Sequence, residues 1–222
     1  MKPRVVVLSA PSGGGKTTIA KAVRDRYPDR FGFSVSATTR KPRAGETDGV
    51  DYHFWSRHRF ETELAQGKFL EHAEYAGELY GTLKSEIDRV LNSGRHVLLD
   101  IEVEGARQIR ERYPPPNSIS IFVLPSEPKV LLERLVKRES ESSQELQKRL
   151  DRAEHEFTQS VHFDRWIRND DLERAVAEVV AAAQDEGFLT RSPKDFQWML
   201  DYSVGLRTEA AKLWDRRHST KG

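Results

Sequence analysis

The sequence contains no cysteine in its 222 residues, which excludes disulfide bonds, thiol catalysis and cysteine-bound metal. It also lacks any apolar run near the ~18 residues that a membrane-spanning helix needs, and its first apolar stretch is too short for a signal-peptide core. The seven histidines are scattered, with no metal-binding pair and no Ser/His/Asp triad. We therefore expect a soluble, unprocessed protein of the cytoplasm.

Excess charge of one sign is also missing. The chain has 36 basic and 35 acidic residues, which gives a net charge of +1. This balance gives no sign of a nucleic-acid or membrane partner, so any basic site must be local. The hydrophobic fraction of 37% suffices for one packed core with smaller lobes inserted into it.

What the sequence does contain is a glycine-rich loop, Ser9–Thr18. It lies between an apolar run typical of a buried strand, Val5–Leu8, and a helical pattern that runs to about Arg26. This is the context of a phosphate-binding loop, in which Lys16 would reach the β- and γ-phosphates and the Thr17 hydroxyl would bind Mg²⁺. The alternative is a flexible glycine linker, but a linker does not need these two residues directly before a helix.

Strand and helix signals alternate along the chain, which predicts an α/β fold. Val97–Ile101 is apolar on both faces, as parallel strands covered by helices are. Its end carries Asp100 and Glu102, at the sheet edge where ligands bind. Two further segments surround a turn, at 68–74 and 78–82. Strands are expected at 31–36, 52–55, 97–101, 118–124 and 164–167, and helices at 58–66, 85–92, 105–112, 127–138, 145–159 and 172–184.

The C-terminal segment predicts one more helix. Ser192-Pro193 is a favourable helix start, and the pattern predicts about 20 amphipathic residues, weakened at Gly205. The helix could dock on the core or form a self-association face, and docking is the preferred interpretation. The apolar side chains expected on one face are Phe196, Met199, Leu200, Ala210, Ala211 and Trp214.

Three cations, Arg40, Lys41 and Arg43, gather in the loop 38–54. In isolation such a run indicates a solvated basic turn. In a chain with a phosphate-binding loop it also fits a second anion site, because a second phosphorylated ligand needs its own cations.

Taken together, these motifs resemble the guanylate kinase family. Order and spacing hold from residue 3 to about residue 184. The matching segments are Ala10–Thr17, Ser34–Glu46, 49–54, 69–71, 80–82, 99–102, 134–135, 138, 148–150 and 169–171.

The resemblance implies an α/β fold with a P-loop NTPase core, in which helices flank a parallel β-sheet, together with an inserted NMP-binding lobe and a helical lid. It implies core segments at 1–34, 96–132 and 161–185, a GMP-binding lobe at 35–95, a lid at 133–160 and a C-terminal helical extension at 186–222. The implied reaction moves the γ-phosphoryl group of ATP to GMP or dGMP, giving ADP and GDP in purine nucleotide metabolism, with Mg²⁺ as cofactor.

The family's site residues carry over to this chain position by position. The implied ATP-binding residues are Ser12, Gly13, Gly14, Gly15, Lys16, Thr17, Thr18 and Asn169. The implied GMP-binding residues are Ser36, Arg40, Arg43, Tyr52, Glu71, Tyr80, Thr82, Asp100 and Glu102. The implied catalytic residues are Lys16, Arg40, Arg134, Arg138 and Arg149. Mg²⁺ would be held by Thr17 directly and by Asp100 through water.

The residue types suit these roles. Arginine forks pair bidentately with phosphate. The Glu71 carboxylate can accept from guanine N1–H and N2–H₂, while the Thr82 hydroxyl donates to O6. Adenine would leave Glu71 unpaired, which a site of this kind rejects strongly.

The chain departs from the family pattern at several positions. Ala10 replaces the first loop glycine, and we expect its methyl group to be tolerated. Thr82 stands where serine is common, and Glu102 stands where the shorter aspartate is common. The lid positions that are usually glycine and threonine, where a stiffer hinge is expected, are Lys137, Glu139 and Ser140.

Two other functions stay open. A non-catalytic guanylate-kinase-like module would bind phosphopeptides, but the retained Lys16, Thr17 and lid arginines disfavour it. A P-loop kinase with another small phosphorylated acceptor, such as a ribose bisphosphate, would need no guanine-reading Glu71. The expected partners are therefore ATP and GMP, with no nucleic acid or membrane, and with possible self-association through the C-terminal helix.

Overall fold

The computed structural model describes residues 2–75, 77–136, 143–184 and 193–219, without the side chains of 143–146, 193 and 214–219. The chain forms two compact units. The first unit combines Met1–Leu8 with Ala20–Ser120, and the second combines Ser9–Ile19 with Ile121–Gly222. No helix in the described ranges is both long and apolar enough to cross a membrane.

The first unit contains parallel strands in the order β2-β7-β1. The register pairs Val5 with Val97 and Leu8 with Asp100. Val97, Leu98 and Leu99 are buried, as the sequence predicts for a strand that is covered on both faces. The elements are β1 (Val5–Ser9), α1 (Lys16–Arg26), β2 (Phe31–Phe33), α3 (Lys84–Asn92), β7 (His96–Asp100) and α4 (Val103–Arg112).

The same unit holds a second sheet with the strand order β4-β3-β6-β5. Its longest strand pairing is the antiparallel hairpin of β5 and β6, which turns at Gly77 with a positive φ of 82°. A separate hydrophobic cluster packs under this sheet, and it includes stacked Phe60 and Phe69. The elements are β3 (Ala37–Thr38), β4 (His53–Phe54), α2 (Arg57–Ala65), β5 (Phe69–Tyr75) and β6 (Glu78–Leu83).

The second unit is built on the parallel pair β8 and β9, in which Ile121 lies opposite Arg165. Every residue of β8 is buried. The elements are β8 (Ser118–Leu124), α5 (Pro128–Val136), α6 (Ser143–Gln159), η1 (Ser160–His162), β9 (Arg165–Arg168), α7 (Leu172–Gln184) and α8 (Pro193–Ser219).

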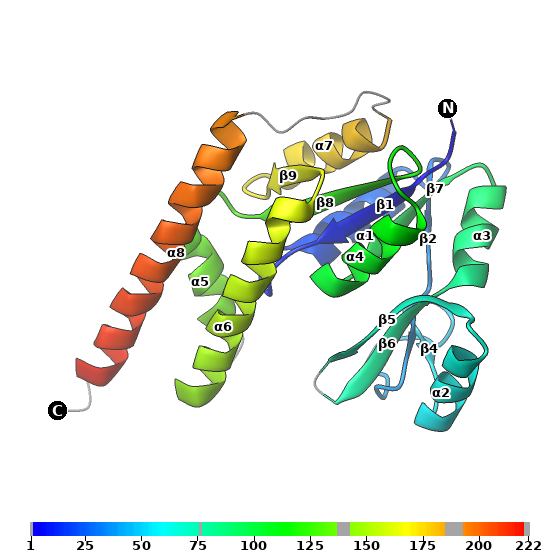
Figure 1. Cartoon of the computed structure of the whole chain (residues 1–222), viewed down its shortest axis with the longest axis horizontal. Helices are drawn as coiled ribbons and strands as arrows, with labels where there is room; N and C mark the ends of the chain where they lie inside the picture. Colours follow the sequence, from blue (N-terminus) through cyan, green and yellow to red (C-terminus); the bar gives the residue numbers. More distant parts are fainter. Residues whose placement is uncertain (1, 76, 137–142, 185–192, 220–222) are drawn as a thin grey trace. The chain divides into compact units, whose positions relative to one another are not determined.

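The C-terminal helix differs from the prediction in length and in its buried face. It has 27 residues and continues through Gly205. A Cβ atom at position 205 would lie 2.9 Å from Pro128 Cγ, so the glycine permits close packing of α8 on α5. The helix contacts both α5 and α6, which confirms docking (Figure 1).

The apolar face predicted for this helix was partly wrong. Met199 is buried, but Phe196 and Leu200 are 45% and 64% exposed. Tyr202 and Leu206 occupy the buried face instead. Trp214 lies among the residues whose side chains are not described.

Two strand predictions also need correction. The strand expected at 31–36 ends at Phe33, and a separate short strand, β3, begins at Ala37. The strand expected at 52–55 is limited to His53–Phe54. Both corrections concern segments of a few residues, where the alternating pattern extends into the flanking loop.

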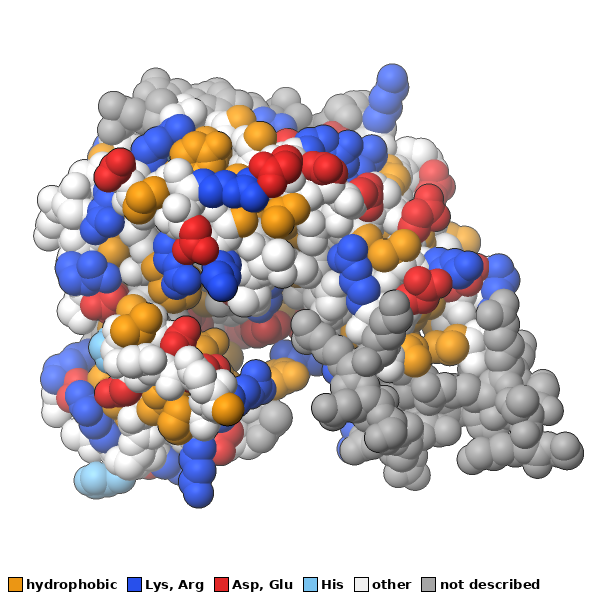
Figure 2. Space-filling view, turned by 180° about the vertical axis from the view of Figure 1, so that it is seen from behind, with side chains coloured by type: hydrophobic (Ala, Val, Ile, Leu, Met, Phe, Trp, Pro, Cys, Tyr) orange, Lys and Arg blue, Asp and Glu red, His pale blue; other side chains and the backbone are white. Residues whose placement is uncertain are grey.

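The surface agrees with the balanced composition. On the face shown in Figure 2, basic and acidic side chains are interspersed, and hydrophobic side chains are scattered among them. Local clusters of charge must therefore be found residue by residue.

Candidate active site

The glycine-rich loop lies in the second unit and has the backbone that phosphate binding requires. Gly13 and Gly15 have φ values of 84° and 93°, in the left-handed region that favours glycine. The Gly14 amide donates to the Pro11 carbonyl at 2.8 Å. Helix α1 begins at Lys16, so its N-terminal amides and partial positive charge lie at the end of the loop. Along the loop, Ser12 is half-buried, whereas Thr17 and Thr18 are exposed.

Ala10, the departure from the family pattern, packs inside this loop. It is only 2% exposed. A Cβ atom at Gly14 would lie 2.8 Å from the Ala10 methyl carbon and 2.9 Å from the Val123 carbonyl oxygen. The methyl group therefore fits only because position 14 has no side chain.

Asn169 and Arg134 lie against the same loop. The Asn169 side-chain amide donates to the Gly14 carbonyl at 2.9 Å and covers Gly15 so closely that a Cβ there would overlap it. The Cβ of Arg134 lies 3.1 Å from where a Gly13 Cβ would be, and its Nη1 lies 3.9 Å from the corresponding Gly15 position. The structure thus gathers Asn169, Arg134 and the loop glycines around one small volume.

The expected lid arginines are only partly described. Arg149 on α6 donates to the Leu135 carbonyl on α5 at 3.0 Å, directly after Arg134. Arg138, together with the departures Lys137, Glu139 and Ser140, lies outside the described residues.

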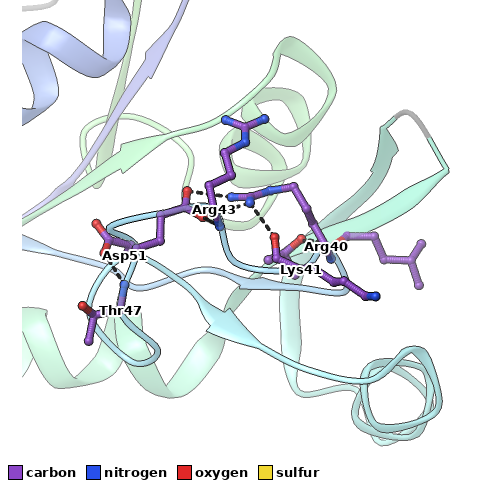
Figure 3. A network of polar contacts seen from close by, with 8 residues as sticks. Arg40, Lys41, Arg43, Thr47 and Asp51 are labelled. Atoms are coloured by element: carbon purple, nitrogen blue, oxygen red, sulfur yellow. Dashed lines mark hydrogen bonds and ion pairs between the residues drawn. The ribbon is translucent and has the colours of Figure 1, made fainter.

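In the first unit, Arg40 is fixed by a carboxylate within its own loop. Its Nη1 and Nη2 donate to Glu46 at 2.9 and 2.8 Å, and Nη1 also donates to the Lys41 carbonyl at 2.7 Å (Figure 3). Three of the five guanidinium donors are used in this way. The Tyr80 side chain is a further hydrogen-bond partner of this guanidinium. Nε–H and the second Nη2–H lie on the edge that faces away from Glu46.

Charge and hydrogen bonding reinforce this pair. The hydrogen bonds from Arg40 and from the Arg43 amide lower the pKa of Glu46 to about 2. The Glu46 hydrogen bond raises the pKa of Arg40, burial opposes this, and the neighbouring Tyr80 hydroxyl raises it further. Glu46 therefore stays ionised throughout the neutral range.

Aromatic rings line the same part of the lobe. The Arg40 guanidinium lies 5.4 Å from the Tyr52 ring centroid, and the rings of Tyr52 and Tyr80 meet edge to face at 6.1 Å. The Arg43 side chain is exposed, and Ser36 is half-buried next to β3. The structure thus places Arg40, Tyr52 and Tyr80 together, as the family resemblance implies.

Glu71 and Thr82 form a buried pair across the β5–β6 hairpin. They lie opposite each other, and the Thr82 hydroxyl donates to Glu71 Oε1 at 2.6 Å. Glu71 is 5% exposed and Thr82 is fully buried. Burial raises the pKa of Glu71 to about 7, although hydrogen bonds from the Thr82 hydroxyl and amide act to lower it.

Asp100 and Glu102 follow β7, and both are half-buried. Glu102 is the residue before α4 but makes no capping hydrogen bond with its side chain. The hydroxyl of Thr17 and the carboxylate of Asp100 are hard oxygen donors, the ligand type that Mg²⁺ prefers together with phosphate oxygens and water. The residues present fit this metal.

Two residues of the site were not singled out from the sequence. Glu46 orients Arg40. It lies six residues after Arg40 in a basic loop, and an acidic residue at that place was the signal that could have identified it. Gly105 lets α4 approach Glu71, because a Cβ there would lie 2.6 Å from Glu71 Oε2. A close approach of this kind leaves no recognisable pattern in the sequence.

Comparison with known proteins gives a consistent result. A family model described as guanylate kinase matches residues 2–186. A guanylate kinase of Synechococcus sp. is 44% identical over 179 residues, covering 81% of this chain and 96% of the relative. A guanylate kinase of Thermus thermophilus is 40% identical over 223 residues and covers 100% of both chains. The crystal structure of guanylate kinase from Anaplasma phagocytophilum has a TM-score of 0.66 and 28% identity, covering 87% of this chain and 92% of that one.

Proposed function

The chain belongs to the guanylate kinase family of P-loop nucleoside monophosphate kinases, and we propose that it transfers the γ-phosphoryl group of ATP to GMP or dGMP. The observation that carries the proposal is the pairing of two half-sites in one chain. The second unit holds a phosphate loop with Lys16, Arg134 and Asn169. The first unit holds the buried Glu71–Thr82 pair.

The Glu71–Thr82 pair suits the edge of guanine. In the free protein the Thr82 hydroxyl donates to Glu71. Guanine would bring N1–H and N2–H₂ to the carboxylate, and the hydroxyl could then rotate to donate to O6. One hydrogen bond would be exchanged for three. Adenine offers no such donors and would leave the buried carboxylate unpaired, a penalty of order 10⁴ in discrimination.

Arg40 would anchor the phosphate of GMP. On binding, the edge formed by Nε–H and the second Nη2–H would donate two parallel hydrogen bonds to phosphate oxygens, and the Tyr80 hydroxyl would turn to the phosphate as well. Glu46 holds the opposite edge and thereby fixes the plane of the guanidinium. Tyr52, Tyr80, Arg43 and Ser36 would supply the remaining donors, and Asp100 and Glu102 would contact the nucleotide from the end of β7.

Phosphoryl transfer requires positioning and charge stabilisation more than covalent chemistry. The loop amides and Lys16 would hold the β- and γ-phosphates, and the guanidinium groups of Arg134 and Arg149 would stabilise charge on the transferred group. When bound by Thr17 and, through water, by Asp100, Mg²⁺ would neutralise phosphate charge. Asn169 Oδ1 would accept from the adenine amino group while Nδ2 keeps its hydrogen bond to Gly14.

These roles assign each segment of the chain to a lobe, a lid, the core or the C-terminal extension. We assign the GMP-binding lobe to 35–95, the lid to 133–160 and an extension to 186–222, with the core at 1–34, 96–132 and 161–185. Arg138 would join the lid arginines on closure.

A cytoplasmic location follows from the supply of ATP and GMP. Self-association through the exposed Phe196 and Leu200 is a further prediction, which sedimentation at several concentrations would test.

The proposed function is tested by incubating purified protein with ATP, Mg²⁺ and GMP and measuring ADP and GDP. We expect turnover with GMP and dGMP and little with AMP or UMP. The Lys16→Ala variant is the inactive control, and turnover no higher than this control would contradict the proposal.

Glu71→Ala should reduce kcat/KM for GMP by at least 100-fold, roughly the cost of an unmet buried recognition group, with ATP binding unchanged. Binding of phosphopeptides without ATP binding, or preference for a non-guanine acceptor, would favour one of the other two functions.

A further inference from the structure

Tyr202 of the C-terminal helix α8 lies within electrostatic range of two residues next to the phosphate loop, Arg134 and Asp170. The helix packs on α5 at Gly205, which lies directly against Pro128, the first residue of α5. Tyr202 lies three residues before Gly205 and therefore on the same side of α8. This side is the one that meets the helix carrying Arg134 (Figure 1).

The ring of Tyr202 is held firmly. It stacks on Phe157 of α6 with the centroids 5.3 Å apart and the planes 15° apart. Trp198 packs edge-on against it at 5.5 Å. The residue is 2% exposed, and its hydroxyl oxygen is buried without a hydrogen-bond partner in the described part of the chain.

Two of the three charged groups that act electrostatically on this hydroxyl, Arg134 and Asp170, lie at or next to the phosphate-loop half-site. Burial raises the pKa of Tyr202, Asp170 raises it further, Arg134 lowers it and Glu127 raises it. Asp170 follows Asn169, the residue whose amide is bonded to Gly14. Its carboxylate is itself anchored, because it accepts from the Ser126 amide at 2.8 Å and from the Ser126 hydroxyl.

Arg134 is available for a new partner. In the described residues its guanidinium makes no hydrogen bond or ion pair, although its Cβ is packed against Gly13. A phenolic hydroxyl can accept one hydrogen bond and donate another. A hydroxyl that accepts from an arginine and donates to a carboxylate therefore satisfies both, and a buried hydroxyl that makes neither bond is unfavourable.

We propose that Tyr202 is a positioning residue for phosphoryl transfer: in the nucleotide-bound state its oxygen accepts from Arg134 and its O–H donates to Asp170. Through this bridge α8 would fix the arginine that meets the transferred phosphoryl group. The inference rests on the proposed function, because it acts through Arg134.

The position of α8 relative to the family's shared segment bears on how strongly Tyr202 should affect kcat. The family model matches residues 2–186, the Synechococcus relative aligns with 81% of this chain, and the Thermus thermophilus relative aligns with 100% of it. Helix α8 therefore lies outside the segment that the family model matches. We expect it to tune the position of Arg134 and not to supply a group that the reaction cannot do without.

The test is Tyr202→Phe in the full-length chain. We expect kcat to fall about 3- to 10-fold, the value of one hydrogen bond, with KM for GMP within twofold of wild type. We also expect the melting temperature to stay the same or rise by about 2–4 °C, because the variant no longer buries an unpaired hydroxyl. If Tyr202 had only a structural role, the Tyr202→Phe variant would not show a lower kcat together with an unchanged melting temperature. Ser203→Ala, which removes a hydroxyl from the adjacent residue, should leave kcat unchanged.

A double-mutant cycle with Arg134→Lys shows whether the effect passes through the arginine. If it does, Tyr202→Phe should slow the Arg134→Lys protein by less than twofold. An undiminished kcat in Tyr202→Phe, or an equal loss in both backgrounds, would overturn the positioning role. An inactive wild-type protein would instead overturn the proposed function itself, so the two failures are distinguishable.

Discussion

At the scale of single residues, Glu71 shows a conflict between folding and recognition. Its carboxylate must be ionised to accept from guanine, but it is 5% exposed and burial raises its pKa to about 7. A carboxyl group with an ordinary pKa in the unfolded chain gives up its proton more easily there than in the folded protein. The recognition group thus weakens the fold at the pH where it is needed.

The pH dependence of stability follows with a definite sign. Between pH 4.5 and about 7 the folded state binds more protons than the unfolded state, so this group lowers the free energy of unfolding as the pH rises. The full cost of about 3 kcal/mol is present above pH 7 and absent below about 4.5. We therefore expect the unfolding free energy of Glu71→Gln minus that of wild type to rise by about 3 kcal/mol as the pH goes from about 4.5 to above 7. Urea titrations at each pH measure this difference. The exposed Glu74→Gln on the same strand should show no such trend, and a flat difference for Glu71→Gln would contradict the raised pKa.

The sequence was informative about these residues to different degrees. The family resemblance singled out Glu71 and Thr82 by their motif positions, and the structure places them opposite each other. Tyr202 could not be predicted, since hydrophobicity ranks Leu200 above it, although Leu200 is 64% exposed and Tyr202 is buried. Which side of a helix is covered depends on its neighbours, here α5 and α6, and these contacts are not encoded in the helix itself.

At the scale of elements, the loop between β3 and β4 is organised by one carboxylate. Glu46 accepts from two guanidinium nitrogens of Arg40 and from the Arg43 amide at 2.6 Å. A second turn in the loop is closed by the Thr47 amide donating to Asp51 at 2.8 Å (Figure 3). The loop's own side chains thus hold its shape, and the neighbouring Tyr52 and Tyr80 add further contacts to Arg40.

Glu46→Gln should therefore act on GMP binding. The variant keeps the size of the side chain but loses the ion pair, so that Arg40 is less well oriented toward phosphate. We expect KM for GMP to rise roughly tenfold, in the range of a charge-assisted hydrogen bond, with KM for ATP unchanged in steady-state assays.

Glu61→Gln is the matched control for this change. Glu61 pairs with Arg57 at 3.5 Å in an exposed helical pair of the same unit, and such pairs contribute little. Equal effects of the two variants would show that lost charge, and not the orientation of Arg40, is responsible.

Helix α8 shows what sequence patterns miss at this scale. Its start at Pro193 was predicted correctly, but the helix was expected to be weakened at Gly205 and to have about 20 residues, whereas it has 27. Glycine disfavours helices by about 1 kcal/mol, and the pattern gave no reason for the residue to be there. The reason is tertiary, because only glycine permits the approach of Pro128.

At the scale of the molecule, the side chains proposed to contact the two nucleotides directly belong to different compact units. Lys16, Arg134 and Asn169 belong to one compact unit, and Arg40, Glu71 and Thr82 belong to the other. Each unit can therefore hold its own nucleotide with its own side chains, and transfer requires both.

This separation can be measured by calorimetry with single nucleotides. Lys16→Ala should weaken ATP binding about 10- to 100-fold through loss of a charged phosphate contact. GMP binding should stay within twofold of wild type, because every residue assigned to GMP lies in the other unit. Lys21→Ala, an exposed lysine of the same helix, should change neither. A large loss of GMP affinity in Lys16→Ala would show that the two half-sites are not independent.

The order in which the chain visits the two units also bears on its synthesis. The chain begins in the first unit, crosses to the second for Ser9–Ile19, and returns before ending in the second. On the ribosome, the acceptor half-site is complete once residue 120 has emerged, and compact units fold as they appear. The phosphate loop, although made among the first residues, must wait for Arg134 and Asn169. A nascent chain would thus acquire its acceptor half before its donor half and could not consume ATP until its synthesis is well advanced.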